Sequence, residues 1–237
     1  MLGKALLACG AAAVAAQAAP LATFVPAGKR FAPRLNGRGR AGHVALTFDD
    51  GPDAQSTPRF LDELRRLDVR ATFFLLGEMC ERYPDQARRI VDEGHEVAVH
   101  SWDHRNHLRN LPGRRTAEQL TRTAELIQAQ TGVTPAYFRP PYGALTSSDL
   151  VEARKLGLRT VLWTAWGQDW QRGLRPQDVV DEVLRGDLDG GTVLLHDSDC
   201  TSEPGSWRAT LGALPALVDA FHGQGLEVGT VGDHGLL

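Results

Sequence analysis

A chain of 237 residues is long enough for one large α/β domain with a well-buried core, and too short for two full-sized domains to be expected. Its apolar and charged fractions, 42% and 23%, are those of an ordinary globular protein. A formal net charge of -3 provides no basic surface for nucleic acid, so we expect no nucleic-acid partner.

The first 25 residues differ in kind from the rest. Lys4 precedes an alanine-rich apolar run over 5–19, which contains the small-x-small pattern Ala16-Gln17-Ala18. This pattern predicts a secretory signal peptide over 1–25. Basic residues follow the run and outnumber the one lysine before it, a bias that opposes export. An uncleaved anchor, or a start codon placed too far upstream, therefore stays open.

Residues 26–42 are rich in proline, glycine and arginine without periodicity, which is typical of a linker, and we expect the folded domain over 43–237. The three cysteines, Cys9, Cys80 and Cys200, lack the Cys-x-x-Cys spacing of a zinc ribbon or a thioredoxin-type motif. Cys80 and Cys200 could pair in an oxidising compartment, and the sequence leaves that question open.

The domain begins with an apolar run over 44–48 that ends in two adjacent carboxylates, Asp49 and Asp50, followed by Gly51-Pro52. Neighbouring residues on a strand point to opposite faces, so the two acids can share a site only if the strand breaks here. A cation held by one carboxylate, with the other left free as a base, would relieve their repulsion. A helix N-cap or an Asx turn on the same four residues is the alternative.

The remaining segments alternate between helix and strand patterns. Helices are predicted from a Ser56 cap with Pro58 in the first turn to Leu67, then over 85–93, 116–130, 147–155, 176–185 and 207–221. Further strands are predicted over 71–76, 96–100, 137–139, 160–163, 192–195 and 227–231. Regular alternation implies a parallel sheet with outer helices, open or closed into a barrel. Polar residues follow the strands, at the end where such barrels carry active sites.

Two histidines, His100 and His104, lie four residues apart directly after a predicted strand. Together with Asp50 they could form an Asp-His-His set that suits Zn²⁺ or a similar cation and leaves a coordination position open. His107 is a second-choice ligand, and two surface or capping histidines are the alternative to a metal pair.

Five segments, in chain order, resemble the motifs of the polysaccharide deacetylase family, the NodB-homology domain of carbohydrate esterase family 4: Thr47-Phe48-Asp49-Asp50-Gly51-Pro52, His100-Ser101-x-x-His104, Arg139-Pro140-Pro141-Tyr142-Gly143, Asp169-Trp170 and Leu194-Leu195-His196-Asp197. The resemblance runs from about His43 to the C-terminus. It implies a distorted (β/α)7-type barrel of parallel strands with outer helices. It also implies a hydrolase acting on carbon-nitrogen bonds other than peptide bonds.

The resemblance implies a role for each matched residue. Asp50, His100 and His104 would bind a divalent metal, Zn²⁺ before Co²⁺, Mn²⁺ or Fe²⁺, and Asp49 would act as the catalytic base. Arg139 would keep Asp49 ionised and oriented, and the backbone N–H of Tyr142 would stabilise the oxyanion.

The remaining motif residues would serve the leaving group and the substrate. His196 is the implied general acid that protonates the departing amine, and Asp169 is its partner. The implied substrate contacts are Pro141, Gly143, Trp170 and Leu194, of which the last two would hold the acetyl methyl. The family often carries an acidic residue three positions before the aspartate of Asp-Trp, and here that residue is Trp166. Trp102, Trp163 and Trp166 are either sugar-stacking platforms or ordinary packing residues.

We therefore expect a monomeric, metal-dependent deacetylase of N-acetylated glycans, with peptidoglycan or a chitin-like polymer as substrate. An O-acetyl xylan-type esterase and a catalytically silent glycan-binding homologue are the alternatives. The N-terminal pattern predicts a secreted or cell-envelope protein with membrane contact only through a possible N-terminal anchor, or a cytoplasmic protein if that segment is no working signal.

Overall fold

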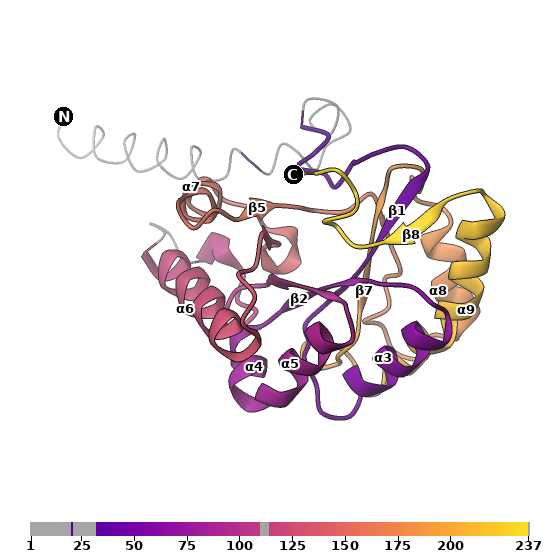
Figure 1. The fold of residues 1–237 in the computed structure, drawn as a ribbon, viewed down its shortest axis with the longest axis horizontal. Helices are drawn as coiled ribbons and strands as arrows, with labels where there is room; N and C mark the ends of the chain where they lie inside the picture. Colours follow the sequence, from indigo (N-terminus) through magenta and orange to yellow (C-terminus); the bar gives the residue numbers. More distant parts are fainter. Residues whose placement is uncertain (1–19, 21–31, 110–113, 237) are drawn as a thin grey trace, which may run out of the picture.

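The computed structural model describes residue 20 and residues 32–109 and 114–236, which contain one α/β domain (Figure 1). Its strands form one parallel sheet in the order β5-β4-β3-β2-β1-β7-β6, with β8 beside the start of β1. The strands are β1 (His43–Asp49), β2 (Thr72–Leu75), β3 (Glu96–Val99), β4 (Tyr137–Phe138), β5 (Arg159–Thr160), β6 (Ala165–Trp166), β7 (Thr192–His196) and β8 (Glu227–Gly229).

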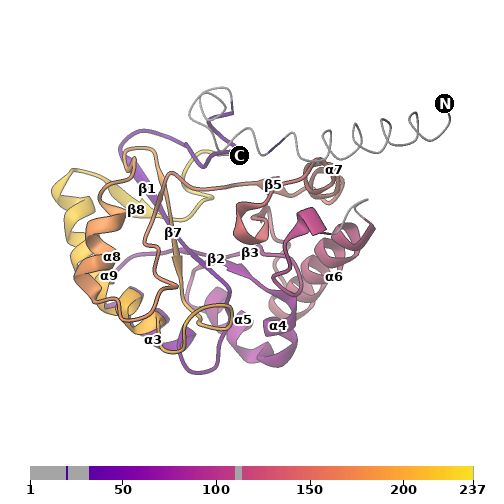
Figure 2. The ribbon, with the colours of Figure 1, turned by 180° about the vertical axis from the view of Figure 1, so that it is seen from behind.

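Helices surround this sheet, as the views from the two sides show (Figures 1 and 2). They are α3 (Thr57–Arg66), α4 (Gly77–Arg82), α5 (Pro84–Asp92), α6 (Arg114–Thr131), α7 (Ser147–Lys155), α8 (Pro176–Val183) and α9 (Trp207–Gly223), with the 3-10 turns η2 (His107–Arg109) and η3 (Pro141–Gly143). The predicted barrel of parallel strands with outer helices is confirmed. Among the described strands, β5 and β6 are the two ends of the order, so the barrel is distorted and open between them.

Strand β1 lies at the centre of the sheet and separates two buried regions. Val44, Leu46 and Phe48 belong to the large apolar core beneath the helices, whereas Ala45 belongs to the smaller cluster inside the barrel. Because side chains alternate along a strand, Asp49 shares the inner face with Ala45. The register places Asp49 directly opposite His196 of β7.

Several elements differ from the sequence-based expectation. The predicted strand over 160–163 is wrong in its bounds, since β5 ends at Thr160 and a separate short strand, β6, follows. Helix α4 was not predicted. Ser56 is the N-cap residue of α3 and Pro58 lies in its first turn, as predicted, but the Ser56 hydroxyl donates to the Asp53 carboxylate (3.0 Å) and makes no cap hydrogen bond.

The predicted signal peptide over 1–25 lies outside the described residues except for Pro20, as does the linker up to residue 31. The described part of that linker lies against the domain: the Leu35 carbonyl accepts from Leu162 N–H (2.8 Å), and Gly39 N–H donates to the Gly190 carbonyl (2.9 Å). The boundary at 42/43 stays a prediction.

Buried Cys80 and exposed Cys200 are both free thiols. No helix within the described ranges is both long and apolar enough to cross a bilayer.

A substitution at Phe48 would test how β1 packs against the helices. Its fully buried ring lies 5.2 Å from that of Phe60 and 5.1 Å from that of Phe73, measured between centroids. Phe48→Ala should therefore lower the free energy of unfolding by about 3–5 kcal/mol, as measured by urea denaturation. The control Val133→Ala, at a 41% exposed position, should change it by less than about 0.5 kcal/mol. Equal effects of the two variants would contradict this account of the core.

Candidate active site

The two adjacent carboxylates reach the same site because the strand ends between them. Asp49 is the last residue of β1, and Asp50 adopts a left-handed backbone conformation with a φ of 76°. Aspartate is among the few residues other than glycine that tolerate this region. A side chain on Gly51 would place its Cβ 2.6 Å from both carboxylate oxygens of Asp197, so only glycine fits here. The predicted strand break is confirmed.

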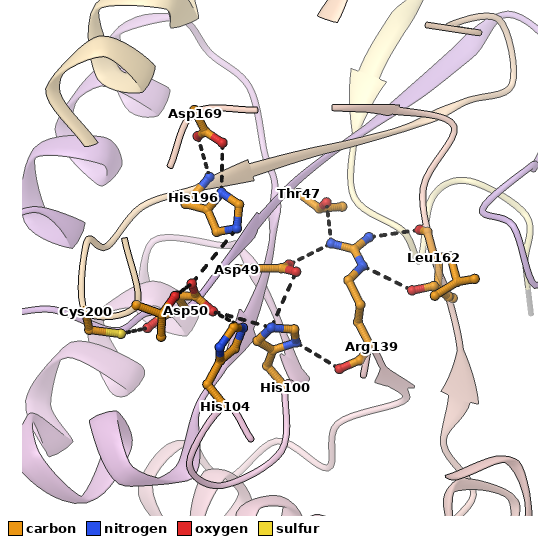
Figure 3. A network of polar contacts seen from close by, with 12 residues as sticks. Thr47, Asp49, Asp50, His100, His104, Arg139, Leu162, Asp169, His196 and Cys200 are labelled. Atoms are coloured by element: carbon orange, nitrogen blue, oxygen red, sulfur yellow. Dashed lines mark hydrogen bonds and ion pairs between the residues drawn. The ribbon is translucent and has the colours of Figure 1, made fainter. Parts of the chain in front are cut away.

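Asp50, His100 and His104 converge on one point (Figure 3). Asp50 Oδ1 lies 3.4 Å from His100 Nε2 and 3.3 Å from His104 Nε2. This oxygen is buried and accepts no hydrogen bond from the described residues, an arrangement that is costly unless a cation binds there. The three residues therefore fit a divalent metal ion.

The hydrogen bonds of His100 fix its tautomer. Its Nδ1–H donates to the Arg139 carbonyl (2.8 Å), so Nε2 presents a lone pair toward Asp50. Burial lowers the pKa of His104 to about 4, which keeps that imidazole neutral and able to bind a metal. Burial alone would raise the pKa of Asp50, but His104 and His100 outweigh it and hold that pKa below its usual range.

Asp49 forms a buried ion pair with Arg139, whose side chain is fully buried (Figure 3). Arg139 Nη1 donates to Asp49 Oδ1 (2.6 Å) and to Thr47 Oγ1 (2.9 Å). The carbonyls of Val161 and Leu162 accept from Nε and Nη2, both at 3.1 Å. These bonds offset the cost of burying the guanidinium and hold the Asp49 carboxylate in one orientation. The other Asp49 oxygen lies 3.6 Å from His100 Nε2.

His196, the last residue of β7, is held by Asp169. The Asp169 carboxylate accepts from His196 Nδ1 and from the His196 backbone N–H, both at 2.8 Å, and from the Thr210 hydroxyl (2.7 Å). Although burial opposes the charge, Asp169 raises the pKa of His196 to about 10. The other nitrogen, Nε2, lies 4.0 Å from Asp50 Oδ2. His196 is therefore a protonated donor that faces the same centre.

A cavity of about 220 Å³ is lined by the acids and imidazoles described above, namely Asp49, Asp50, His100, His104 and His196. Of the predicted substrate contacts, Gly143, Trp170 and Leu194 line it, and so does Tyr142, whereas Pro141 is buried in η3 and is absent from its lining. The wall near His196 is aromatic, because Trp163 and Trp166 stack at 6.1 Å between centroids, and Trp170 lies 5.9 Å from His196.

Trp102 lies elsewhere, with its ring 3.4 Å from the guanidinium carbon of Arg122. His107 is not in the metal-binding set, because its Nδ1 lies 2.6 Å from Asp149 Oδ1. The second-choice assignment of His107 as a ligand is therefore wrong.

Sequence reasoning missed two contributors to the site. Thr201 and Ser202 line the cavity, and the Thr201 hydroxyl donates to Asp50 Oδ2. Both lie in the turn after β7, where no pattern marks them. Asp197, the last residue of the fifth motif, is fully buried behind the site, accepts from the Thr57 hydroxyl, and has its pKa raised to about 7 by burial.

Comparison with known proteins gives consistent matches. The family model described as "Polysaccharide deacetylase" matches residues 36–161. The chain is 34% identical over 189 residues to a peptidoglycan-N-acetylglucosamine deacetylase of Bacillus cereus, covering 80% of the chain and 68% of that relative. It is 37% identical over 193 residues to a chitooligosaccharide deacetylase of Bradyrhizobium, covering 78% and 87%. A Listeria monocytogenes relative, peptidoglycan-N-acetylglucosamine deacetylase PgdA, is also 37% identical; the match covers 78% of the chain but only 40% of PgdA.

Solved structures agree. The Bc1960 peptidoglycan N-acetylglucosamine deacetylase superposes with a TM-score of 0.75 at 30% identity, covering 84% of this chain and 90% of that one. BA3943 of Bacillus anthracis, described as a CE4 family pseudoenzyme, superposes with a TM-score of 0.74 at 29% identity, covering 82% and 65%. The fold of this chain is thus similar both to a protein described as a deacetylase and to one described as a pseudoenzyme.

The separate positions of the two acids predict different effects on metal binding. Asp50→Asn removes the charged member of the set, and should weaken Zn²⁺ binding by more than about 100-fold. Asp49→Asn leaves the set intact and should weaken it by no more than about tenfold. Calorimetric titration of the metal-free protein distinguishes the two. Equal losses would mean that Asp49 is also a ligand.

Proposed function

The chain belongs to the polysaccharide deacetylase family, and on this premise we propose that it is a metal-dependent hydrolase that removes N-acetyl groups from an amino-sugar glycan. One observation carries the proposal. An Asp-His-His metal set, a carboxylate beside it and a protonated imidazole opposite all face one cavity at the carboxyl ends of parallel strands.

Asp50, His100 and His104 would hold the metal. Bound there, a divalent cation supplies Lewis acidity, which lowers the pKa of water and polarises an acyl carbonyl. Zn²⁺ suits two imidazoles and one carboxylate best, and Co²⁺, Mn²⁺ and Fe²⁺ suit them too.

Asp49 acts as the base that accepts a proton from the attacking water. Its ion pair with Arg139 leaves Oδ2 free of the guanidinium and fixes its direction. As the water oxygen bonds to the carbonyl carbon, charge develops on the carbonyl oxygen, and the Tyr142 backbone N–H is the proposed donor to it. Losing such a donor typically costs about 3 kcal/mol of transition-state stabilisation.

His196 completes the reaction as general acid. An amide nitrogen does not leave as an anion, so the proton on His196 Nε2 passes to that nitrogen as the carbon-nitrogen bond breaks. Acetate and a free amine result. Asp169 holds the ring by Nδ1 and stabilises the charged form. Trp170 and Leu194 offer an apolar surface to the acetyl methyl.

The glycan is proposed from the relatives. One is named for peptidoglycan N-acetylglucosamine and another for chitooligosaccharides, and N-acetylglucosamine is common to both polymers. The placement of His196 opposite the metal set suits amide hydrolysis, because a departing amine needs a proton from a nearby donor. We place the enzyme in the cell envelope on the strength of its N-terminal pattern alone. The monomeric state also stays a prediction.

Acetate release tests the proposal directly. N-acetylglucosamine oligomers, peptidoglycan and acetylxylan are each incubated with the protein, with and without chelator. We expect release from the first two, lost on chelation and reduced by about 10²–10⁴-fold in Asp49→Asn. Asp219→Asn, an equivalent change on the exposed face of α9, should retain full activity.

Other outcomes would identify the alternatives. Release from acetylxylan alone supports the esterase. A glycan bound but never deacetylated supports the silent homologue, for which BA3943 is a precedent. Release that survives both chelator and Asp49→Asn rejects the mechanism.

The pairing of His196 with Asp169 predicts a pH effect. A general acid works only while protonated, so activity is present below its pKa and lost as pH rises through it. Asp169 raises that pKa to about 10, so Asp169→Asn should lower it and move the alkaline limb of kcat/KM to lower pH. Thr210→Val, which keeps the carboxylate, should leave the limb near its original position. An unmoved limb in Asp169→Asn would exclude His196 as the acid.

A further inference from the structure

A chain of hydrogen-bonded polar side chains lies beneath the loop that carries His100 and His104. Gln119 Nε2 donates to Asp103 Oδ1 (2.7 Å), and Gln119 Oε1 accepts from the Ser101 hydroxyl (2.8 Å). Ser101 Oγ lies 2.8 Å from His107 Nε2, and His107 Nδ1 lies 2.6 Å from Asp149 Oδ1. All except Asp103 are at least 95% buried. None of these side chains is among the groups that the proposed reaction uses.

The protons of this chain can be assigned in order. The Asp103 carboxylate only accepts, so the Gln119 amide must turn its NH₂ toward it and its oxygen toward Ser101. The single hydroxyl proton of Ser101 is then donated to Gln119, so Ser101 Oγ must accept from His107 Nε2–H.

Asp149 completes the assignment. Its Oδ2 accepts from the Thr146 backbone N–H (2.6 Å) and hydroxyl (2.9 Å). Asp149 Oδ1 lies 2.6 Å from His107 Nδ1, so both nitrogens of the buried His107 ring are hydrogen-bonded, one to Asp149 and one to Ser101.

Ser101, His107 and Asp149 have the order and spacing of a nucleophilic triad, but they do not form one. The Ser101 hydroxyl is fully buried, and it donates to Gln119 instead of to the imidazole. A serine nucleophile needs both access to substrate and a neutral histidine that accepts its proton. This set of hydrogen-bonded side chains is therefore not a second catalytic site.

The hydrogen-bonded side chains do hold in place a loop with an unfavourable backbone conformation. Ser101 and His104 both have left-handed conformations, with φ of 72° and 53°. Such residues persist only where surrounding contacts over-determine them. The Ser101 carbonyl also accepts from Gly77 N–H and from the Thr123 hydroxyl, both at 3.0 Å. Ser101 is thus fixed at its side chain and at its carbonyl.

Asp149 connects this loop to a second one. It lies in the first turn of α7 and forms a capping box with Thr146, just after the segment that carries Tyr142. His107 also stacks on Phe138, with an interplanar angle of 12°, next to Arg139. One imidazole thereby links the metal-binding loop to the loop of the Arg139 motif.

We propose that His107 and Asp149 are positioning residues that act through Ser101 to preset the metal-binding geometry of His100 and His104. The inference rests on the proposed metal role of those two histidines. Supporting residues that orient metal ligands typically change metal affinity by about 10–100-fold when removed. Metal affinity, measured without substrate, is therefore the appropriate readout.

The test titrates metal-free protein with Zn²⁺ by calorimetry and with Co²⁺ by visible absorption. Ser101→Ala separates the loop from the His107–Asp149 pair without disturbing that pair, and Asp149→Asn replaces the carboxyl group that contacts His107. Each should weaken binding of both ions by about 10–100-fold and alter the Co²⁺ spectrum. His107→Gln, which keeps an N–H donor, should lose less affinity than His107→Leu.

A buried histidine elsewhere controls for general destabilisation. His43, at the opposite end of β1 from Asp49, is fully buried with its Nδ1 2.8 Å from His234 Nδ1. His43→Leu should lower Tm yet leave metal affinity within about twofold, since distant sites act independently. If Asp149→Asn does not fold, Ser101→Ala decides the question.

Wild-type affinity in Ser101→Ala, or an equal loss in His43→Leu, would overturn the proposal. Failure of the wild-type protein to bind either metal would instead reject the proposed function.

Discussion

The buried guanidinium of Arg139 is the interaction on which the rest of the site depends. Its side chain donates to Asp49 and Thr47 on β1 and to two carbonyls after β5, while its own carbonyl accepts from His100 after β3. A charge so placed is tolerated because its three nitrogens donate four hydrogen bonds, one of them to a carboxylate. One residue therefore fixes both the proposed base and a proposed metal ligand, so the two cannot be adjusted independently.

Around that contact the site is built in two layers. Asp49, Asp50, His100, His104 and His196 face the cavity, and buried polar partners lie behind several of them. Arg139, Asp169 and the Ser101–His107–Asp149 chain are such partners, and all are at least 99% buried. Hydrogen bonds in such a buried, low-dielectric environment are strong when satisfied and costly when broken. They therefore keep the cavity-facing side chains rigid.

The cavity-facing residues could be predicted from the sequence, and most of their partners could not. Parallel strands end at one edge of the sheet, so chemical groups that follow apolar runs, such as Asp50 and His100, are expected to meet. Thr201 and Asp149 follow no such rule, because loops carry no periodicity and their contacts cross long stretches of sequence. The side-chain hydrogen bond expected of the Ser56 cap is absent for a related reason, since the Asp53 carboxylate competes locally for the hydroxyl.

The register of β1 against β7 sets the separation of the proposed proton acceptor and donor. Asp49 and His196 are paired neighbours in the sheet, so their backbones lie one inter-strand distance apart, about 4.8 Å. Ladder hydrogen bonds, and not loop conformation, maintain that spacing. The turn that carries Thr201 and Ser202 borders the cavity outside this ladder, and it can therefore vary without altering the distance between the proposed proton acceptor and donor.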